Sequence, residues 1–157
     1  MRVLQATLAT LIALTVNLAP AFADHHQSGE SAKPKSADEV AIAAVIQDYF
    51  DGIGAADAEK LNRAFAADKA AMLGSVKNED GTRSLMAFKD MEAVVAGWAG
   101  NDNPEGAGRD GEILHMKIME GQIAMVMFRY KDEYYDVLTL LKDDGVWKIV
   151  TKTFFTR

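Results

Sequence analysis

The chain has 157 residues, no cysteine and a formal net charge of −6. At roughly 100–200 residues per domain, this length predicts one domain with one hydrophobic core. The negative charge disfavours binding to phosphate backbones, so nucleic acid is not expected as a partner. The lack of cysteine excludes disulfide frameworks, thiolate zinc sites and cysteine nucleophiles.

The first 23 residues have the three parts of a secretory signal peptide. A single basic residue, Arg2, precedes an apolar run, and the segment ends in the small-x-small sequence Ala21-Phe22-Ala23. The apolar run is shorter than the roughly 20 residues that span a bilayer, which disfavours a retained membrane anchor. We therefore expect residues 1–23 to be removed, and the mature chain to be periplasmic or secreted with no membrane attachment.

Residues 24–36 are polar and lack apolar periodicity, so they are expected to form a flexible tether. Cleavage after residue 23 would place Asp24, His25 and His26 at the new amino terminus. The free amine, two backbone amides and the His26 imidazole would resemble a square-planar site for Cu(II) or Ni(II). A polar linker that happens to contain histidines is the simpler interpretation. No metal site and no cofactor are expected in the domain that follows.

The domain opens with signals for two helices. A capping box begins at Ser36, and an apolar stripe at helical spacing follows it. Gly52 and Gly54 are the expected stop of this first helix. Asp57 is the expected cap of a short second helix that ends near Asp68.

A short hairpin is predicted from residues 70–76 and 82–86, which flank a turn-forming cluster that ends in Asp-Gly. Residues 91–98 return to helical spacing and predict a third helix, and a long polar loop follows it. The chain closes with four strand-like segments, at 112–119, 123–131, 134–142 and 146–155. The links between these four segments are too short for parallel crossovers, so an antiparallel meander is expected.

One of the predicted strands, residues 123–131, is apolar on both faces. One face carries Ala124, Val126, Phe128 and Tyr130, and the other carries Ile123, Met125 and Met127. An antiparallel sheet with only one covered face would carry polar residues on the other face. We therefore expect helices to cover one face of the sheet and a second copy of the chain to cover the other, which predicts a homodimer.

The order of these elements resembles the nuclear transport factor 2-like superfamily, and several motifs resemble its putative lumazine-binding group. The motifs are YFDG at residues 49–52, DAEKL at 57–61, Phe65, DKA at 68–70 and DGVWKIVTKTF at 144–154. The resemblance covers residues 37–157. It implies an α+β, cone-shaped (cystatin-like) fold, in which three N-terminal helices and a small hairpin pack on a curved four-stranded antiparallel sheet. Relatives include ketosteroid isomerases, SnoaL-like cyclases and dehydratases, and non-catalytic modules, so the fold alone does not choose a function.

Three residues are candidates for catalysis: His115, Tyr49 and Asp136. In a ketosteroid isomerase, a tyrosine of the first helix and a carboxyl group in the sheet donate hydrogen bonds to the substrate, and an acidic residue on a strand is the base. The resemblance places Tyr49 near the position of the tyrosine and Asp136 near that of the carboxyl donor. It places Leu73 at the position of the base, and because leucine cannot abstract a proton, that mechanism is disfavoured. His115 is the only histidine of the domain and would be an acid or base near neutral pH if it faced the pocket. Lys117, two residues away on the same strand face, favours the alternative in which both side chains point outward.

Aromatic and methionine side chains are the remaining indication of a ligand pocket, although an ordinary core needs such residues too. The pocket candidates are Tyr49, Phe65, Trp98, Phe128, Tyr130, Tyr135 and Trp147. We expect an exported protein that binds a small apolar or aromatic molecule without transforming it. The alternatives are a cofactor-independent dehydratase or isomerase of the SnoaL-like kind, and a dimeric interaction module with no ligand.

Overall fold

The computed structural model describes residues 35–106 and 111–157 of the chain. The predicted signal peptide, most of the predicted tether and the candidate metal site at Asp24, His25 and His26 lie outside the described residues. Within the two described ranges, no helix has both the length and the apolar character needed to cross a membrane.

Three helices form in the predicted order, and each begins at a polar cap. Helix α1 (Ala37–Ala55) starts after Ser36, whose hydroxyl accepts from the Glu39 amide while the Glu39 carboxylate accepts from the Ser36 amide. This is the complete capping box that the sequence predicted. The Asp57 side chain caps α2 (Ala58–Ala64), and the Asp90 side chain caps α3 (Met91–Ala99).

The ends of the first two helices differ from the prediction. Helix α1 continues through Gly52 and Gly54, and its C-cap is Ala56 in the left-handed conformation, with φ of 52°. A Cβ atom at Gly52 would lie 2.8 Å from Cγ of Leu61, so this glycine permits α1 and α2 to pack closely rather than stopping α1. Helix α2 ends earlier than expected, at Ala64.

The strands form one six-stranded mixed sheet in the order β2-β1-β6-β5-β4-β3, which corrects the expected four-stranded antiparallel sheet. The six strands are β1 (Ala71–Lys77), β2 (Arg83–Phe88), β3 (Gly111–Met119), β4 (Ile123–Tyr130), β5 (Tyr134–Asp143) and β6 (Val146–Thr156). The hairpin of β1 and β2 therefore extends the sheet instead of packing on it. Strand β1 pairs with β6 in parallel, whereas all other neighbours are antiparallel. Short links restrict only strands that are adjacent in sequence, so they carried no information about this long-range pair.

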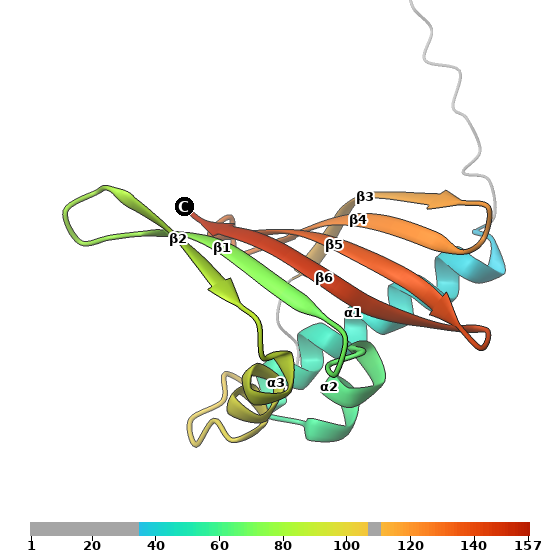
Figure 1. Cartoon of the computed structure of the whole chain (residues 1–157), viewed down its shortest axis with the longest axis horizontal. Coiled ribbons are helices and arrows are strands. Elements are labelled where there is room, and N and C mark those ends of the chain that lie inside the picture. Colours follow the sequence, from blue (N-terminus) through green and yellow to red (C-terminus); the bar gives the residue numbers. More distant parts are fainter. Residues whose placement is uncertain (1–34, 107–110) are drawn as a thin grey trace, which may run out of the picture. The chain divides into compact units, whose positions relative to one another are not determined.

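The three helices lie on one face of the sheet, which we call the inner face (Figure 1). The core between helices and sheet is apolar, and its fully buried members include Ile42, Leu61, Val126, Leu138 and Ile149. The opposite, outer face of the sheet carries large apolar side chains that this single chain leaves exposed. These are Leu73, Met125, Met127, Val137, Leu141 and Phe155.

A β-bulge decides which side chains of β3 face the helices. The register of the β3–β4 pair shifts between Ile113 and His115. As a result Ile113, Met116 and Ile118 pack against the core, whereas His115 is exposed. Lys117 is exposed as well, so the structure agrees with the alternative in which His115 and Lys117 both point outward.

Candidate functional site

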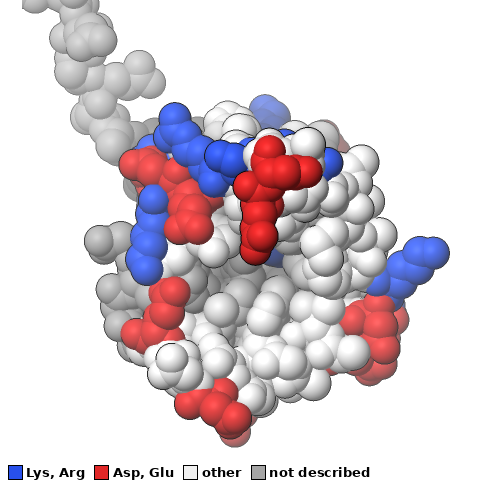
Figure 2. Space-filling model, turned by 90° about the vertical axis from the view of Figure 1, so that its left-hand side faces the viewer, with Lys and Arg blue, Asp and Glu red and all other residues white. Residues whose placement is uncertain are grey.

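A cavity of about 390 Å³ opens between α1, α3 and the inner face of the sheet. This volume lies within the range of small-ligand sites in proteins, roughly 300–1,000 Å³. Eight of its 14 lining residues are aromatic: Tyr49, Phe50, Phe88, Trp98, Phe128, Tyr130, Tyr134 and Phe154. The others are Ile53, Met72, Val94, Glu105, Asp136 and Lys152. Figure 2 shows a hollow walled by uncharged side chains, with charged side chains around its rim.

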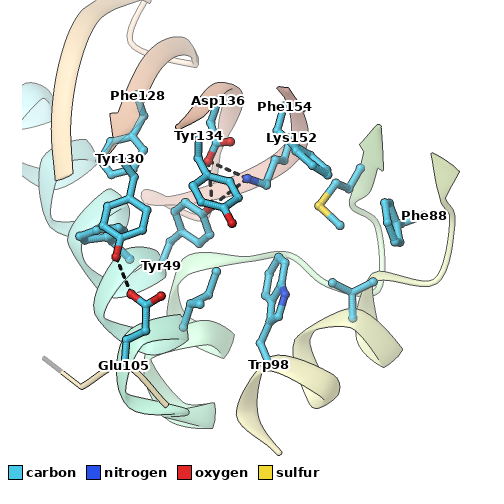
Figure 3. A pocket seen from close by; sticks show the side chains of 14 residues that line it. Tyr49, Phe88, Trp98, Glu105, Phe128, Tyr130, Tyr134, Asp136, Lys152 and Phe154 are labelled. Carbon is cyan, nitrogen blue, oxygen red and sulfur yellow. Dashed lines mark hydrogen bonds and ion pairs between the residues drawn. The ribbon is translucent and has the colours of Figure 1, made fainter. Parts of the chain in front are cut away.

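Three polar side chains, the Tyr49–Asp136–Lys152 triad, meet on the sheet side of the cavity (Figure 3). The Tyr49 hydroxyl donates to Oδ2 of Asp136 at 2.8 Å, and Nζ of Lys152 donates to the Tyr49 oxygen at 2.8 Å. Lys152 and Asp136 also form an ion pair, with 2.6 Å between Nζ and Oδ2. Only 4 % of Asp136 and 7 % of Lys152 is exposed, so this is a buried ion pair at the wall of the cavity.

Burial dominates the electrostatics of the triad. It lowers the pKa of Lys152, while Asp136 acts in the opposite direction. The ammonium also lies 5.3 Å from the centre of the Tyr49 ring and 4.8 Å from that of Phe154, distances at which ring faces attract a cation. Oδ1 of Asp136 is buried and has no hydrogen-bond partner among the described residues, so the carboxylate is only partly compensated for its lost hydration.

A second polar group lies across the cavity from the triad. The Tyr130 hydroxyl donates to the Glu105 carboxylate, and Nζ of Lys131 lies 3.4 Å from the same oxygen. The Tyr130 ring stacks on Tyr134 with 5.9 Å between centroids, and burial raises the pKa of Tyr134. The cavity therefore combines apolar walls with hydrogen-bonding groups at two sides, which is typical of sites that fix the orientation of a ligand.

The structure places four of the seven candidate pocket residues in the cavity lining: Tyr49, Trp98, Phe128 and Tyr130. The other three lie elsewhere. Phe65 packs edge-on against Tyr49 in the core, at 5.4 Å between centroids. Tyr135 stacks on Phe155 at 4.8 Å, on the opposite side of β5 from Asp136, because neighbouring residues of a strand alternate between faces. Trp147 is buried and donates its indole N–H to Asp38 at 2.9 Å.

Of the three catalytic candidates, the structure brings together Tyr49 and Asp136 but not His115. His115 is exposed on β3 and does not line this cavity. Leu73 is half exposed on β1, and its neighbour Met72 faces the cavity instead. In the described part of the chain, no group of three or more acidic or histidine side chains is placed to hold a metal ion.

Lys152 is the member of the triad that sequence reasoning missed. Strict alternation from Trp147 and Ile149 would place Thr151 on the inner face and Lys152 on the outer face. The register of the β5–β6 pair shifts, however, because Leu140 pairs with Ile149 while Thr139 pairs with Thr151. Val150 is thus the extra residue of a β-bulge, and Lys152 returns to the inner face. Regular alternation along β5 did carry the signal for Asp136, which shares its face with the buried Leu138 and Leu140.

Solved structures of low sequence identity have the same fold. An NTF2-like protein of unknown function from Shewanella baltica OS155 is 22% identical with a TM-score of 0.59, and the match covers 80% of this chain and 98% of that one. An NTF-2 like protein of unknown function from Silicibacter pomeroyi DSS-3 is 22% identical with a TM-score of 0.55, covering 75% and 94%. A ketosteroid isomerase-like protein from Erwinia carotovora atroseptica SCRI1043 is 14% identical with a TM-score of 0.53, covering 78% and 98%. No curated protein matches the sequence.

These likenesses show that the chain has the NTF2-like, cystatin-like α+β fold that its element order predicted. A family-level match comes from the sequence itself. The family described as Putative lumazine-binding matches residues 37–155, a range that includes all three helices and all but the last residue of β6. The chain therefore belongs to the Putative lumazine-binding family.

Proposed function

We propose that this protein binds a small, planar, largely apolar molecule in the cavity between α1, α3 and the sheet. The observation that carries the proposal is the cavity itself, about 390 Å³ in volume and lined mainly by aromatic rings. Such rings stack on flat ligands and gain affinity from the apolar area that binding buries. The description of the family supports the same class of function.

The charges around the cavity favour a neutral ligand over a strongly charged one. Asp136 and Lys152 compensate each other at 2.6 Å, and Glu105 lies 3.4 Å from Lys131. A ligand with a net charge would have to compete with one of these pairs. A neutral heterocycle would instead use the polar groups for orientation and the rings for affinity.

Tryptophan fluorescence offers a direct test, because the two tryptophans of the chain differ in place. Trp98 lines the cavity, whereas Trp147 is outside the lining and bonded to Asp38. Titration with lumazine, a planar bicyclic heterocycle, and with naphthalene as an apolar probe should quench the emission and reach saturation. The quench should persist in Trp147→Phe and be lost in Trp98→Phe. No saturable quench with either probe, in a protein whose circular dichroism shows it folded, would contradict the proposal.

A second candidate function is proton-transfer catalysis, and the Tyr49–Asp136–Lys152 triad is the observation that favours it. Cofactor-independent isomerases and dehydratases commonly move protons with hydrogen-bonded acid and base side chains in a buried cavity. The ion pair with Lys152, however, makes Asp136 an acceptor of hydrogen bonds, so it does not serve as a second donor. Incubation with a β,γ-unsaturated ketone such as 3-cyclohexenone tests this candidate. A double-bond shift that is lost in Tyr49→Phe would support it, and no turnover above buffer would exclude this reaction.

We also propose that residues 1–23 direct export and that the outer face of the sheet forms a homodimer. The dimer is supported by exposed apolar side chains on four strands, including Leu73, Met127 and Val137. Light scattering of the purified protein should give twice the chain mass, and a charged substitution such as Met127→Glu should give the monomer.

The export proposal is tested by amino-terminal sequencing of periplasmic protein, which should begin at Asp24. A dimer that binds neither probe would favour the third alternative, an interaction module without a ligand.

A further inference from the structure

We propose that Lys152 is an amine nucleophile that captures small aromatic aldehydes as a protonated imine inside the cavity. This inference rests on the proposed function, since the aldehyde must first enter the same cavity. It adds a covalent step and names the ligand class, an uncharged aromatic aldehyde. The geometry behind it is the position of Nζ on the cavity wall, beside one carboxylate and one phenol.

Burial distinguishes Lys152 from the other ion-paired lysines of the described chain. Its side chain is 8% exposed, compared with 20% for Lys142, 31% for Lys60, 55% for Lys131 and 67% for Lys69. Desolvation penalises the ammonium form and lowers the pKa of Lys152. A larger share of neutral amine makes a lysine a better nucleophile toward carbonyl carbon, and burial in an apolar pocket is one way in which proteins achieve this.

Asp136 and Tyr49 are placed to handle the protons of the reaction. The ammonium of Lys152 first gives one proton to Asp136, whose Oδ2 lies 2.6 Å away. The neutral amine then attacks the carbonyl carbon and forms a C–N bond. One amine proton passes to the carbonyl oxygen, and the Tyr49 hydroxyl, 2.8 Å from Nζ, can relay it. The product of this step is a carbinolamine.

The second half of the reaction expels water and restores the ion pair. The protonated carboxyl of Asp136 returns its proton to the carbinolamine hydroxyl, the C–O bond breaks and water leaves. The nitrogen lone pair completes the C=N bond and leaves an iminium cation. In total, ammonium plus aldehyde gives iminium plus water, and nothing is oxidised or reduced. Asp136 ends as the counter-ion of the iminium, just as it began as the counter-ion of the ammonium.

The cavity also limits which aldehydes can react. Its volume of about 390 Å³ and its eight aromatic side chains suit one or two fused rings. A carboxylate on the ligand would meet Asp136 on one side or Glu105 on the other, without an unpaired cation among the lining residues. Benzaldehyde and 2-naphthaldehyde are therefore good probes, and 4-carboxybenzaldehyde is a matched poor one.

Reductive trapping followed by peptide mass mapping tests the proposal. The protein is incubated with benzaldehyde and sodium cyanoborohydride, which converts an imine into a stable benzylamine. Lys142 is an internal control in the same sample, because it too is paired with a carboxylate at 2.6 Å but lies outside the cavity lining. Lys152 should be modified roughly ten-fold faster than Lys142 or more, because the cavity holds the bound aldehyde beside its Nζ and gives the reaction a high effective concentration. An excess of naphthalene should slow modification of Lys152 but not of Lys142.

Two different variants at Lys152 are tested, so that the result does not depend on one of them being stable. Lys152→Arg retains the cation but removes the nucleophile, and the double variant Lys152→Met/Asp136→Asn removes both buried charges together. Both should lose the cavity adduct, whereas Lys142→Met should keep it. Equal labelling of Lys152 and Lys142 would overturn the proposal. If lumazine or naphthalene still quenched Trp98 in that case, the proposed binding function would stand, and if neither did, both would fail.

Discussion

Two ion pairs of this domain have the same length and very different surroundings. Lys152 and Asp136 are 2.6 Å apart beside the cavity, and Lys142 and Asp38 are 2.6 Å apart where the first turn of α1 meets β5. The side chains of the first pair are 8% and 4% exposed, and those of the second are 20% and 31% exposed. The two pairs therefore differ in their desolvation cost although their separations are equal, because the cost of removing charges from water increases with burial.

The more exposed pair is completed by a third group. Asp38 accepts from Lys142 and from the Trp147 indole, and the Lys142 ammonium lies 5.0 Å from the centre of the Trp147 ring. The carboxylate also lies in the first turn of α1, where a negative charge is favourable. Every group of this cluster holds α1 against the sheet. The cavity pair also has a third group, Tyr49, but it leaves Oδ1 of Asp136 without a partner among the described residues, an arrangement that costs stability.

The largest expected effect is the removal of the buried cation. Lys152→Met should lower the free energy of unfolding by about 3–5 kcal/mol, because Asp136 would remain buried without a counter-ion. Urea unfolding followed by circular dichroism measures this loss. The double variant Lys152→Met/Asp136→Asn should recover most of it. If the single variant were as stable as the wild type, the buried Asp136 would not depend on Lys152 for compensation of its charge.

The next largest effect concerns the phenol between the two charges. Tyr49→Phe should lower the free energy of unfolding by about 1–3 kcal/mol, because Lys152 loses an acceptor and Asp136 loses a donor in a buried site. The same urea titration reports it. Tyr135→Phe, which removes a tyrosine hydroxyl on the outer face of the sheet, away from the triad, is the matched control. A neutral result for Tyr49→Phe would show that water or a rearranged Lys152 replaces the lost bonds.

A smaller loss is expected from the exposed pair, and it should depend on acid. Hydrogen bonds from Lys142 and Trp147 lower the pKa of Asp38 below its usual 3.8. A carboxylate with a depressed folded-state pKa stabilises the protein above its unfolded pKa, and this contribution is lost as the pH falls through the folded value. Thermal unfolding between pH 7 and pH 2 should therefore show a drop below about pH 4 that is smaller in Asp38→Asn. An unchanged profile in that variant would assign the acid sensitivity to other carboxylates.

The smallest effect comes from Lys152, whose lowered pKa costs stability at neutral pH, whereas the lowered pKa of Asp38 adds stability there. Burial lowers the pKa of Lys152 below 10.5, so between the folded value and 10.5 the unfolded chain binds more protons than the folded one. Stability should accordingly rise with pH in that window. Relative to the double variant Lys152→Met/Asp136→Asn, the wild type should gain stability from neutral pH toward pH 10. If the wild type instead lost stability relative to the double variant in that range, the effect of Asp136 on the pKa of Lys152 would be larger than the effect of burial.

Local signals explain which parts of this structure were predictable. The caps at Ser36 and Asp57 and the helical spacing over 91–98 depend on residues close together in sequence, and the three helices begin where these signals place them. The parallel pairing of β1 with β6 joins distant segments, and nothing in either strand specifies its partner. The prediction of a four-stranded sheet was therefore wrong, because the sheet continues from β6 into β1 and β2.

The site was predictable only where the strands alternate regularly. Strands β4 and β5 keep their alternation, so Phe128, Tyr130 and Asp136 follow from the sequence. Helical periodicity placed Tyr49 and Trp98 on apolar faces, but it could not separate cavity from core, as Phe65 illustrates. Lys152 required knowledge of the bulge at Val150, which depends on pairing with β5 rather than on any local motif.

The bulge at Val150 divides β6 into two halves of opposite phase. Before it, Trp147 and Ile149 face inward and belong to the core, and after it Lys152 and Phe154 face inward and line the cavity. Deletion of Val150 would remove the bulge and leave the pairing of Ile149, Thr151 and Lys152 with β5 unchanged, so Lys152 and Phe154 would still face inward. The bulge therefore lets one strand present its odd-numbered residues to the core and its even-numbered residues to the cavity.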